Sequence, residues 1–164
     1  MRPITLLVGC SGTGKNYIAK ALNLRSLPSF ATRPKRDGET DGVEHIFVTI
    51  KSWETVYSHQ KNIVAYTFFD GNHYWSTLEQ LESADYDVYV IDPAGVRYFL
   101  QNFGDKIQRQ YSIVYIKTSI RKRIIRMRQR KDPWKKIIKR LWNDIVEFRG
   151  FEKDNTIPKI VIEV

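Results

Sequence analysis

The chain has 164 residues, of which 42% are hydrophobic and 27% charged, and this is enough for one folded domain with its own core. Its single cysteine, Cys10, excludes an internal disulfide and suits a reducing compartment, so we expect the cytoplasm. No apolar run approaches the ~20 residues that span a bilayer, and the N-terminus leads straight into an apolar strand. We therefore expect neither a membrane partner nor a signal peptide.

The net charge of +9 is concentrated in one segment. Of the 27 Lys/Arg and 18 Asp/Glu, twelve basic residues and one acid, Asp132, lie within residues 117–140, and the remainder of the chain is close to neutral. This distribution predicts a local anion site rather than a generally basic surface. A solvated basic helix and a nucleic-acid-binding surface are the alternatives at this stage.

A glycine-rich loop lies between the first predicted strand and the first predicted helix. Residues 4–8 form a short apolar run typical of a buried strand, and residues 16–24 carry apolar side chains at helical spacing. The intervening G-C-S-G-T-G-K-N fits the phosphate-binding pattern G-x-x-x-x-G-K-[S/T] except at Asn16, where a hydroxyl normally meets Mg²⁺. The predicted ATP-binding residues are Gly9, Ser11, Gly12, Thr13, Gly14, Lys15 and Asn16.

Strands and helices alternate through most of the remaining chain. We predict strands at 87–92, 111–116 and 159–164, a helix at 94–103, a helix from the Ser119 cap to about 130, and a helix with Asp132 as its cap that runs from Pro133 toward 151. This alternation predicts an α/β fold with a parallel, doubly wound sheet as its core. Asp92 ends a strand, where an acid commonly holds Mg²⁺ directly or through water; a helix-capping aspartate is the alternative.

Residues 29–85 break this alternation. The segment contains three glycines, short strands near 46–50 and 63–69, and a helix near Leu78. We interpret it as a small α+β insertion on the parallel core.

The insertion begins with a pattern that resembles the guanylate kinases, T-R-x-x-R-x-x-E-x-x-G-x-x-Y-x-F. Here it is represented by Thr32, Arg33, Arg36, Glu39, Gly42, His45 and Phe47. The likeness continues through G-N-H-Y-W-S-T at 71–77, I-D-P-A-G-V at 91–96, the spacing of Arg126 and Arg130, and Arg140-Leu141. The resemblance covers nearly the whole chain. It implies a P-loop core at 1–28, 86–118 and 141–164, a nucleoside-monophosphate-binding insertion at 29–85, and a helical lid at about 119–140.

The resemblance also implies a reaction, the transfer of the γ-phosphoryl group of ATP, with Mg²⁺, to a nucleoside monophosphate. It implies catalytic roles for Lys15 and for three arginines in and beside the lid, Arg126, Arg130 and Arg140, which would neutralise the transferring group. The positions that it assigns to the acceptor are Ser29, Arg33, Arg36, His45, Ala65, Tyr74, Ser76 and Asp92. Guanidinium groups suit the monophosphate because they meet its oxygens in pairs. We expect a solvated face for a further set of basic residues, Lys122, Arg123, Arg128, Lys131, Lys135 and Lys136.

The departures from the family pattern fall mostly in the base pocket. The glutamate that reads guanine in the family is matched here by Ala65, and the glycine after Tyr74 is replaced by Trp75, which we expect to fill part of the vacated volume. A pocket that loses a hydrogen-bonding group loses discrimination of about 10⁴–10⁵. We therefore expect base specificity to be shifted or broadened, unless a local shift of the alignment makes Asp70 the reader.

Three other functions remain open from the sequence: a kinase of a phosphorylated sugar, a non-catalytic guanylate-kinase-like binding module, and a nucleic-acid binder. After Thr32-Arg33-Pro34, the run R-D-G-E at 36–39 favours a nucleotide kinase over a sugar kinase. The retained Lys15 and lid arginines argue against a non-catalytic binding module. Small-molecule nucleotides are thus the expected partners rather than nucleic acid, and the protein is expected to be a monomer or homodimer. The chain ends on its last strand, as would suit a phage-encoded enzyme in its host's cytoplasm.

Overall fold

A computed structural model describes residues 2–57, 62–69 and 71–164 of the chain. The larger of its sheets is the parallel core expected from the sequence, with four strands in the order β6-β1-β7-β8. These strands are β1 (Ile4–Gly9), β6 (Val88–Val90), β7 (Tyr111–Lys117) and β8 (Lys159–Glu163). All three pairings are parallel, with Leu6 of β1 opposite Tyr89 on one side and Ile113 on the other. The prediction of a parallel α/β core is confirmed.

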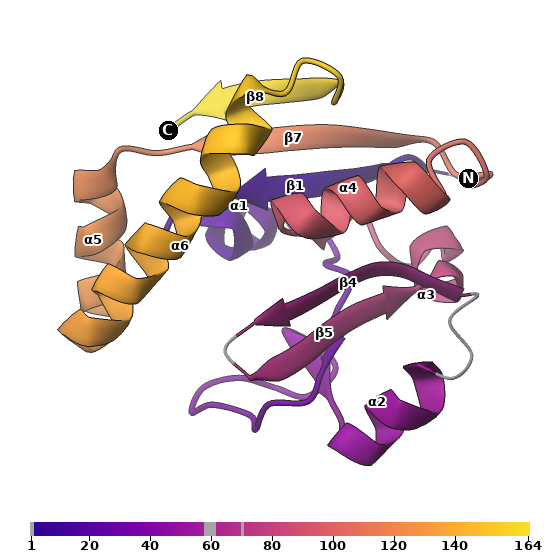
Figure 1. Cartoon of the computed structure of the whole chain (residues 1–164), viewed down its shortest axis with the longest axis horizontal. Coiled ribbons are helices and arrows are strands. Elements are labelled where there is room, and N and C mark those ends of the chain that lie inside the picture. The colour runs from indigo at the N-terminus through magenta and orange to yellow at the C-terminus, as the bar shows by residue number, and fades with distance from the viewer. Residues whose placement is uncertain (1, 58–61, 70) are drawn as a thin grey trace.

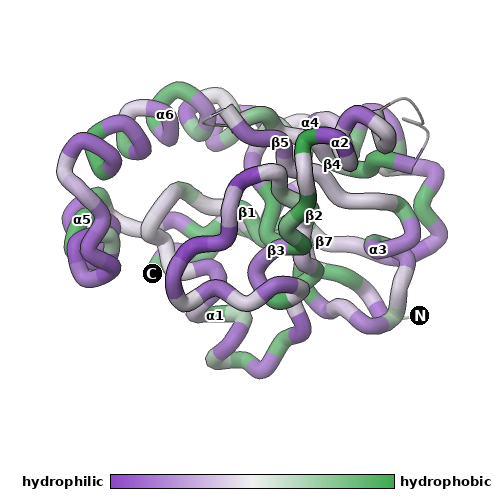
Figure 2. The backbone as a smooth tube through the Cα atoms, turned by 90° about the horizontal axis from the view of Figure 1, so that it is seen from below, coloured by the Kyte–Doolittle hydropathy of each residue, from purple (hydrophilic) through white to green (hydrophobic). Residues whose placement is uncertain are grey.

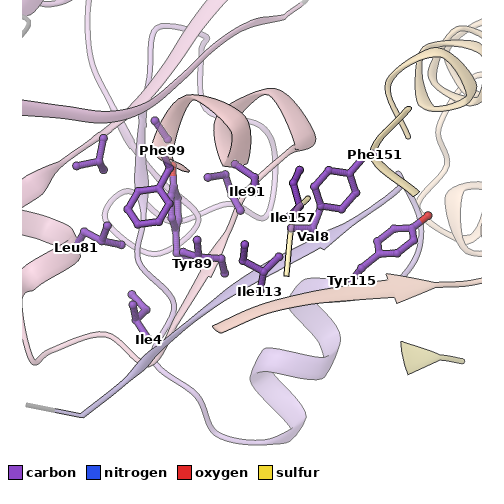
Figure 3. Packing of buried hydrophobic residues seen from close by; sticks show 14 of the residues in the cluster. Ile4, Val8, Leu81, Tyr89, Ile91, Phe99, Ile113, Tyr115, Phe151 and Ile157 are labelled. Atoms are coloured by element: carbon purple, nitrogen blue, oxygen red, sulfur yellow. The ribbon is translucent and has the colours of Figure 1, made fainter. Parts of the chain in front are cut away.

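Helices cover both faces of this sheet (Figure 1). The short helix α1 (Lys15–Ala21) packs on one face through Ala19, which meets Leu7 and Ile116. On the other face lie α4 (Pro93–Asn102) and α6 (Trp134–Lys153). Figure 3 shows Phe151 of α6 close to Val8 and Tyr115, and Phe99 of α4 close to Tyr89 at the other end of the cluster. The sheet is therefore doubly wound, and its main core lies between β1, β7, α4 and α6.

The second sheet is built from the segment that broke the alternation. Its order is β3-β2-β5-β4, where β2 (Ser29–Ala31) pairs parallel with β3 (His45–Phe47), and β4 (Ile63–Phe69) and β5 (Asn72–Thr77) form an antiparallel hairpin. The helix α2 (Ile50–Tyr57) lies below this hairpin and α4 above it (Figure 1). The short helix α3 (Leu78–Glu82) follows β5 and begins with a capping box at Thr77.

Several elements of this second sheet differ from the sequence prediction. The strand expected at 46–50 is only three residues long, and α2 begins where it was expected to end. Thr49 explains the change, because its hydroxyl accepts from the amide of Ser52 and so starts a helix. The segment 72–77, which matches a turn in the family pattern, is a full strand here. The strand β2 was also not predicted, since three residues carry too little periodicity.

Two helices project from the end of the core beside the glycine-rich loop: α5 (Ile120–Gln129) and α6. Figure 2 shows hydrophilic and hydrophobic residues alternating along α6, as expected for a helix with one buried stripe. Ser119 caps α5 as predicted, because its hydroxyl accepts from the amide of Lys122. The prediction that Asp132 caps α6 is wrong: the cap residue is Pro133, and the Asp132 carboxylate binds arginines instead. Among the described residues, no helix has the length and apolar character needed to cross a bilayer.

Candidate functional site

The glycine-rich loop between β1 and α1 has the curled backbone that phosphate-binding loops need. Gly12 and Gly14 have positive φ angles of 79° and 93°, the left-handed region that glycine enters without strain. A Cβ added at Gly12 would lie 2.8 Å from the carbonyl oxygen of Arg123, so α5 rests directly on the loop. Successive amides in such a turn, at the start of a helix, form a site for an anion.

Lys15 at the end of the loop is enclosed by it. Its ammonium group donates to the carbonyl oxygens of Gly9 at 2.5 Å and Cys10 at 3.3 Å. Burial lowers the pKa of Lys15 to about 8, against the attraction of the Asp144 carboxylate. A phosphate bound here would raise the pKa of Lys15 again and favour its charged form, since an opposite charge nearby raises the pKa of an ammonium group.

Residues of α5 and α6 hold the loop from the opposite side. Arg126 donates to the carbonyl oxygen of Thr13 at 2.6 Å. Arg123 and Asp144 form a buried ion pair, and both members also bind Ser11. The prediction that Arg123 lies on a solvated face is therefore wrong, since the residue is only 5% exposed. Burial raises the pKa of Asp144, although the Arg123 guanidinium opposes this effect.

A pocket lined by cations lies between the loop, the second sheet and the end of α5. It has a volume of about 350 Å³. Five of its lining residues carry positive charge, namely Lys15, Arg33, Arg36, Arg130 and Arg140. Tyr74 and Ser11 line it as well. Cations gathered in one hollow repel one another, so their arrangement points to polyanion binding.

Acidic residues orient these arginines. Glu39 accepts two hydrogen bonds of 2.6 Å from the guanidinium of Arg33, and this pairing lowers the pKa of Glu39 to about 2. Asp132 accepts from Arg130 at 2.7 Å and from Arg140 at 2.8 Å. These three ion pairs fix the positions of the guanidinium groups of Arg33, Arg130 and Arg140. Arg36 lies 3.9 Å from Glu39 but is half-exposed, so it retains donors for a ligand.

Comparison with known proteins assigns the chain to a family. The guanylate kinase family model matches residues 1–157. The chain belongs to the guanylate kinase family. Among curated relatives, the guanylate kinase of Mycoplasmopsis pulmonis is 28% identical over 125 residues, covering 70% of this chain and 63% of its own. That of Neisseria gonorrhoeae is 35% identical over 101 residues, covering 56% and 49%.

A solved structure supports the fold. The guanylate kinase of Anaplasma phagocytophilum superposes with a TM-score of 0.67 at 23% identity, covering 98% of this chain and 76% of that one. The likeness in fold thus extends over almost the whole chain. The chain nevertheless spans only about half to two thirds of the length of the curated relatives it matches.

A second cavity, called the base cavity below after the role proposed for it, adjoins the cationic pocket. It has a volume of about 270 Å³. Its walls come from the loop, β4, β5, the start of α4 and α6. Polar side chains on these walls are Ser29, His45, Thr67, Tyr74, Asp92, Asn143, Asp144 and Glu147. The cavity and the cationic pocket share Ser11, Lys15 and Arg140, so they form one continuous site.

Ala65 lies in the wall of this cavity, buried among core residues. The nearby polar group on the same strand is Thr67, whose hydroxyl donates to the Asp92 carboxylate at 2.6 Å. Ser76, opposite Ala65 in the hairpin, is fully buried. Asp70 lies outside the described residues. Thr67 and Asp92 are thus the polar pair that β4 and α4 present to the cavity.

Trp75 does not fill the volume beside Ala65, contrary to the sequence expectation. It is the cross-strand partner of Tyr66, so its side chain leaves the hairpin on the opposite face from Ala65 and Thr67. There the indole stacks on Phe30, with ring centroids 5.2 Å apart, and packs against Trp53 of α2. The indole ring therefore packs behind the sheet, although Trp75 still contributes to the cavity wall.

Ser29 and His45 meet at the edge of the second sheet. The Ser29 hydroxyl and His45 Nδ1 lie 2.9 Å apart, and the imidazole ring is tilted against Tyr74. Burial lowers the pKa of His45, and the nearby Arg33 adds to this effect. Both effects favour the neutral imidazole, which can hydrogen-bond Ser29 without adding charge to the pocket.

Two residues were predicted as magnesium ligands. Asn16 is exposed at the start of α1 and lines a hollow with Arg126 and Arg130, in which no carboxylate side chain among the described lining residues could share a cation with its amide oxygen. Both oxygens of Asp92 already accept hydrogen bonds, from the amide of Gly95 at 2.7 Å and from Thr67. Asp92 thus caps α4, and it would have to exchange the Thr67 bond to reach a metal. No cluster of three or more metal-binding side chains occurs within residues 2–57, 62–69 and 71–164.

Sequence reasoning missed Thr67 and three residues of α6 that line the base cavity, Asn143, Asp144 and Glu147. A signal for Asp144 was present. It lies on the same helical stripe as Arg140, Phe148 and Phe151, and an acid on a core-facing stripe requires a buried partner. Burial, together with the neighbouring Asp92 and Asp144 carboxylates, raises the pKa of Glu147.

Proposed function

We propose that the protein is an ATP-dependent nucleoside monophosphate kinase. The observation that carries this proposal is the continuity of the site. A cavity of the size of a nucleobase opens into a pocket of five cations, and that pocket adjoins the phosphate-binding loop. Membership of the guanylate kinase family supports the same conclusion.

The residues have distinct roles in this proposal. The acceptor monophosphate lies against Arg33, Arg36 and Tyr74, and its base enters the cavity beside Ala65 and Thr67. The loop at 9–16 binds the ATP phosphates, and Mg²⁺ bound with the nucleotide neutralises charge on them. Lys15 lies between donor and acceptor because it lines both the hollow on the ATP side of the loop and the cationic pocket.

The lid arginines complete the site. Arg130 and Arg140, paired by Asp132, line the pocket opposite Arg33 and Arg36. Their charge stabilises the phosphoryl group as it passes between two anions that would otherwise repel. Closure over the substrates also excludes water, and so limits hydrolysis of ATP.

The base that the site accepts differs from, or is broader than, guanine alone. The family's guanine-reading glutamate is matched by Ala65, and the hydroxyl of Thr67 is already bound to Asp92. A neutral alanine cannot accept hydrogen bonds from the ring N–H and amino group of guanine. The site should therefore bind other purines, pyrimidines and modified bases with affinities closer to its affinity for guanine.

Steady-state kinetics with ATP and six acceptors, GMP, dGMP, AMP, dTMP, CMP and UMP, test both parts. Turnover of any of them supports the kinase function, and kcat/KM ratios within about a hundredfold across bases support relaxed specificity. A preference for GMP above about a thousandfold contradicts the relaxed specificity but not the kinase. ATP turnover on none of the six, with a phosphorylated sugar as the active acceptor instead, contradicts the nucleotide function.

A further inference from the structure

We propose that Arg123 and Asp144 are positioning residues that set the place of the γ-phosphate of ATP by clamping Ser11. The inference rests on the proposed kinase function for the identity of the donor nucleotide. Its basis is the way in which two helices reach one residue of the phosphate-binding loop. Neither residue was expected from the sequence to act on the loop.

Ser11 is held at all its polar groups. Its amide donates to Asp144 Oδ2 at 3.1 Å, and its hydroxyl donates to Asp144 Oδ1 at 3.4 Å. Its carbonyl oxygen accepts from Arg123 Nε at 2.8 Å. The guanidinium of Arg123 also forms an ion pair with Asp144. One loop residue is thus enclosed by a four-way network from α5 and α6.

The network is buried and charged. The side chains of Arg123 and Asp144 are only 7% and 9% exposed. A buried ion pair adds little to stability compared with a well-packed apolar pair, because both charges lose their hydration. A charged pair in this position is therefore better explained by what it holds in place than by the stability it provides.

The network holds Ser11 where, in the proposed function, the donor and acceptor phosphates meet. Ser11 lines both the base cavity and the cationic pocket, whereas the hollow on the ATP side is lined by residues 12–18. The group of ATP that must reach this junction is the γ-phosphate. The nearby residues of the loop, Gly12 and Gly14, rest against α5, so Ser11 is the point where α6 is joined to the loop.

The geometry leads to a specific expectation about nucleotide affinity. If the clamp positions the γ-phosphate, its loss weakens binding of a triphosphate more than binding of a diphosphate. The residues that meet the acceptor phosphate, Arg33, Arg36 and Tyr74, stay intact, whereas Asp144 but not Arg123 also lines the base cavity. A residue that only stabilised the fold would lower all three affinities together.

The experiment measures dissociation constants by calorimetry for ADP, for the non-hydrolysable β,γ-imido analogue of ATP, and for GMP or the best acceptor of the panel. We expect Asp144→Ala and Arg123→Leu each to weaken analogue binding by about tenfold, since charge-assisted hydrogen bonds are lost. ADP affinity changes by less than about threefold in both variants, and so does acceptor affinity in Arg123→Leu, whose side chain does not line the base cavity. Asp144→Asn, whose amide oxygen still accepts from the Ser11 amide, recovers part of the loss.

The double variant Arg123→Leu/Asp144→Ala keeps the test valid if either single variant unfolds, because it leaves no buried charge unpaired. We expect the double variant to fold and still to lose its preference for the triphosphate analogue over ADP. Asp87→Ala is the matched control: it breaks an Arg–Asp pair with Arg25 at the opposite end of β6, and should leave every affinity unchanged.

The proposal is overturned if the double variant retains the wild-type ratio of analogue to ADP affinity, or if all three affinities fall in parallel. Binding is measured without turnover, so the result does not depend on the kinase reaction. A wild-type protein that binds nucleotides but phosphorylates none of the acceptors would refute the proposed function and still allow the clamp to be tested.

Discussion

The donor side and the acceptor side of this site are built in different ways. On the donor side, one continuous loop at 9–16 supplies the phosphate cradle, and buried charges from α5 and α6 hold it in place. On the acceptor side, the cavity wall is assembled from β4, β5, α4 and α6, and its rear is supported by stacked aromatic rings. The donor side is a local sequence motif, whereas the acceptor side brings together segments that are distant in the sequence.

This difference explains why one side keeps the family pattern and the other does not. A phosphate is the same in every nucleotide, so Lys15 and the arginines that meet it have little freedom to change. A base pocket can change with its ligand, and the substitution at Ala65 leaves the surrounding hairpin intact because Trp75 packs on the other face. Altering the two sides separately tests the contrast.

The largest effect is expected at the loop lysine. Lys15→Ala should lower kcat/KM for phosphoryl transfer by about a thousandfold, because the variant lacks the charge that lies between the donor and acceptor phosphates. Coupled steady-state assays at saturating acceptor measure it. Lys20→Ala, which removes an exposed lysine from the same helix, is the control and should keep full activity. Retention of more than about a tenth of activity in Lys15→Ala would contradict the assigned site.

A smaller effect, confined to binding of the acceptor, is expected when Arg36 is replaced. Arg36→Ala should raise KM for the nucleoside monophosphate by about tenfold to a hundredfold, because a charged donor to the phosphate is lost. KM for ATP should change little, since the donor loop is unaffected. Lys35→Ala removes a neighbouring exposed charge and serves as the control. Equal changes in both KM values would show that Arg36 is not confined to the acceptor side.

The contrast also explains what the sequence could predict. Local patterns were sufficient for the glycine-rich loop and the Ser119 cap, because each depends on residues close together in the chain. The parallel core, which pairs distant strands, followed from the alternation of strands and helices along the chain. The second sheet was predicted less well. Its strands β2 and β5 were not predicted, since pairing across a sheet decides such elements more than their own composition does.

Contacts between distant segments were the hardest feature to predict from the sequence. Arg123 resembled any other cation of a basic helix until Asp144, 21 positions later, was seen to lie beside it. Trp75 was expected in the base cavity because the strand on which it lies was not recognised, and pleating decides which face a side chain takes. The predicted roles of Ser29, Arg33 and Arg36 remain predictions, although Arg33 and Arg36 both line the cationic pocket.

A pH effect is expected on the donor side alone. Burial lowers the pKa of Lys15 to about 8, so ATP meets a charged lysine below pH 8 and a neutral one above it. ATP affinity should be flat below pH 8 and fall by about tenfold per pH unit above it, because the bound state requires the proton. Calorimetry at pH 7 to about 9.5 measures this. Lys15→Arg, which stays charged, should remove the dependence. A flat profile in the wild type would contradict it.

The smallest effect is expected at the last residue of the loop motif. Asn16 offers Mg²⁺ an amide oxygen where the motif has a hydroxyl, and it is exposed at the start of α1 with room for either group. Asn16→Thr should therefore keep activity or raise it by about twofold to threefold at limiting Mg²⁺, and should change nothing at saturating metal. Initial rates across a magnesium titration distinguish these cases. A large loss at limiting metal would instead mean that the amide is specifically required, and that the donor side has diverged along with the base pocket.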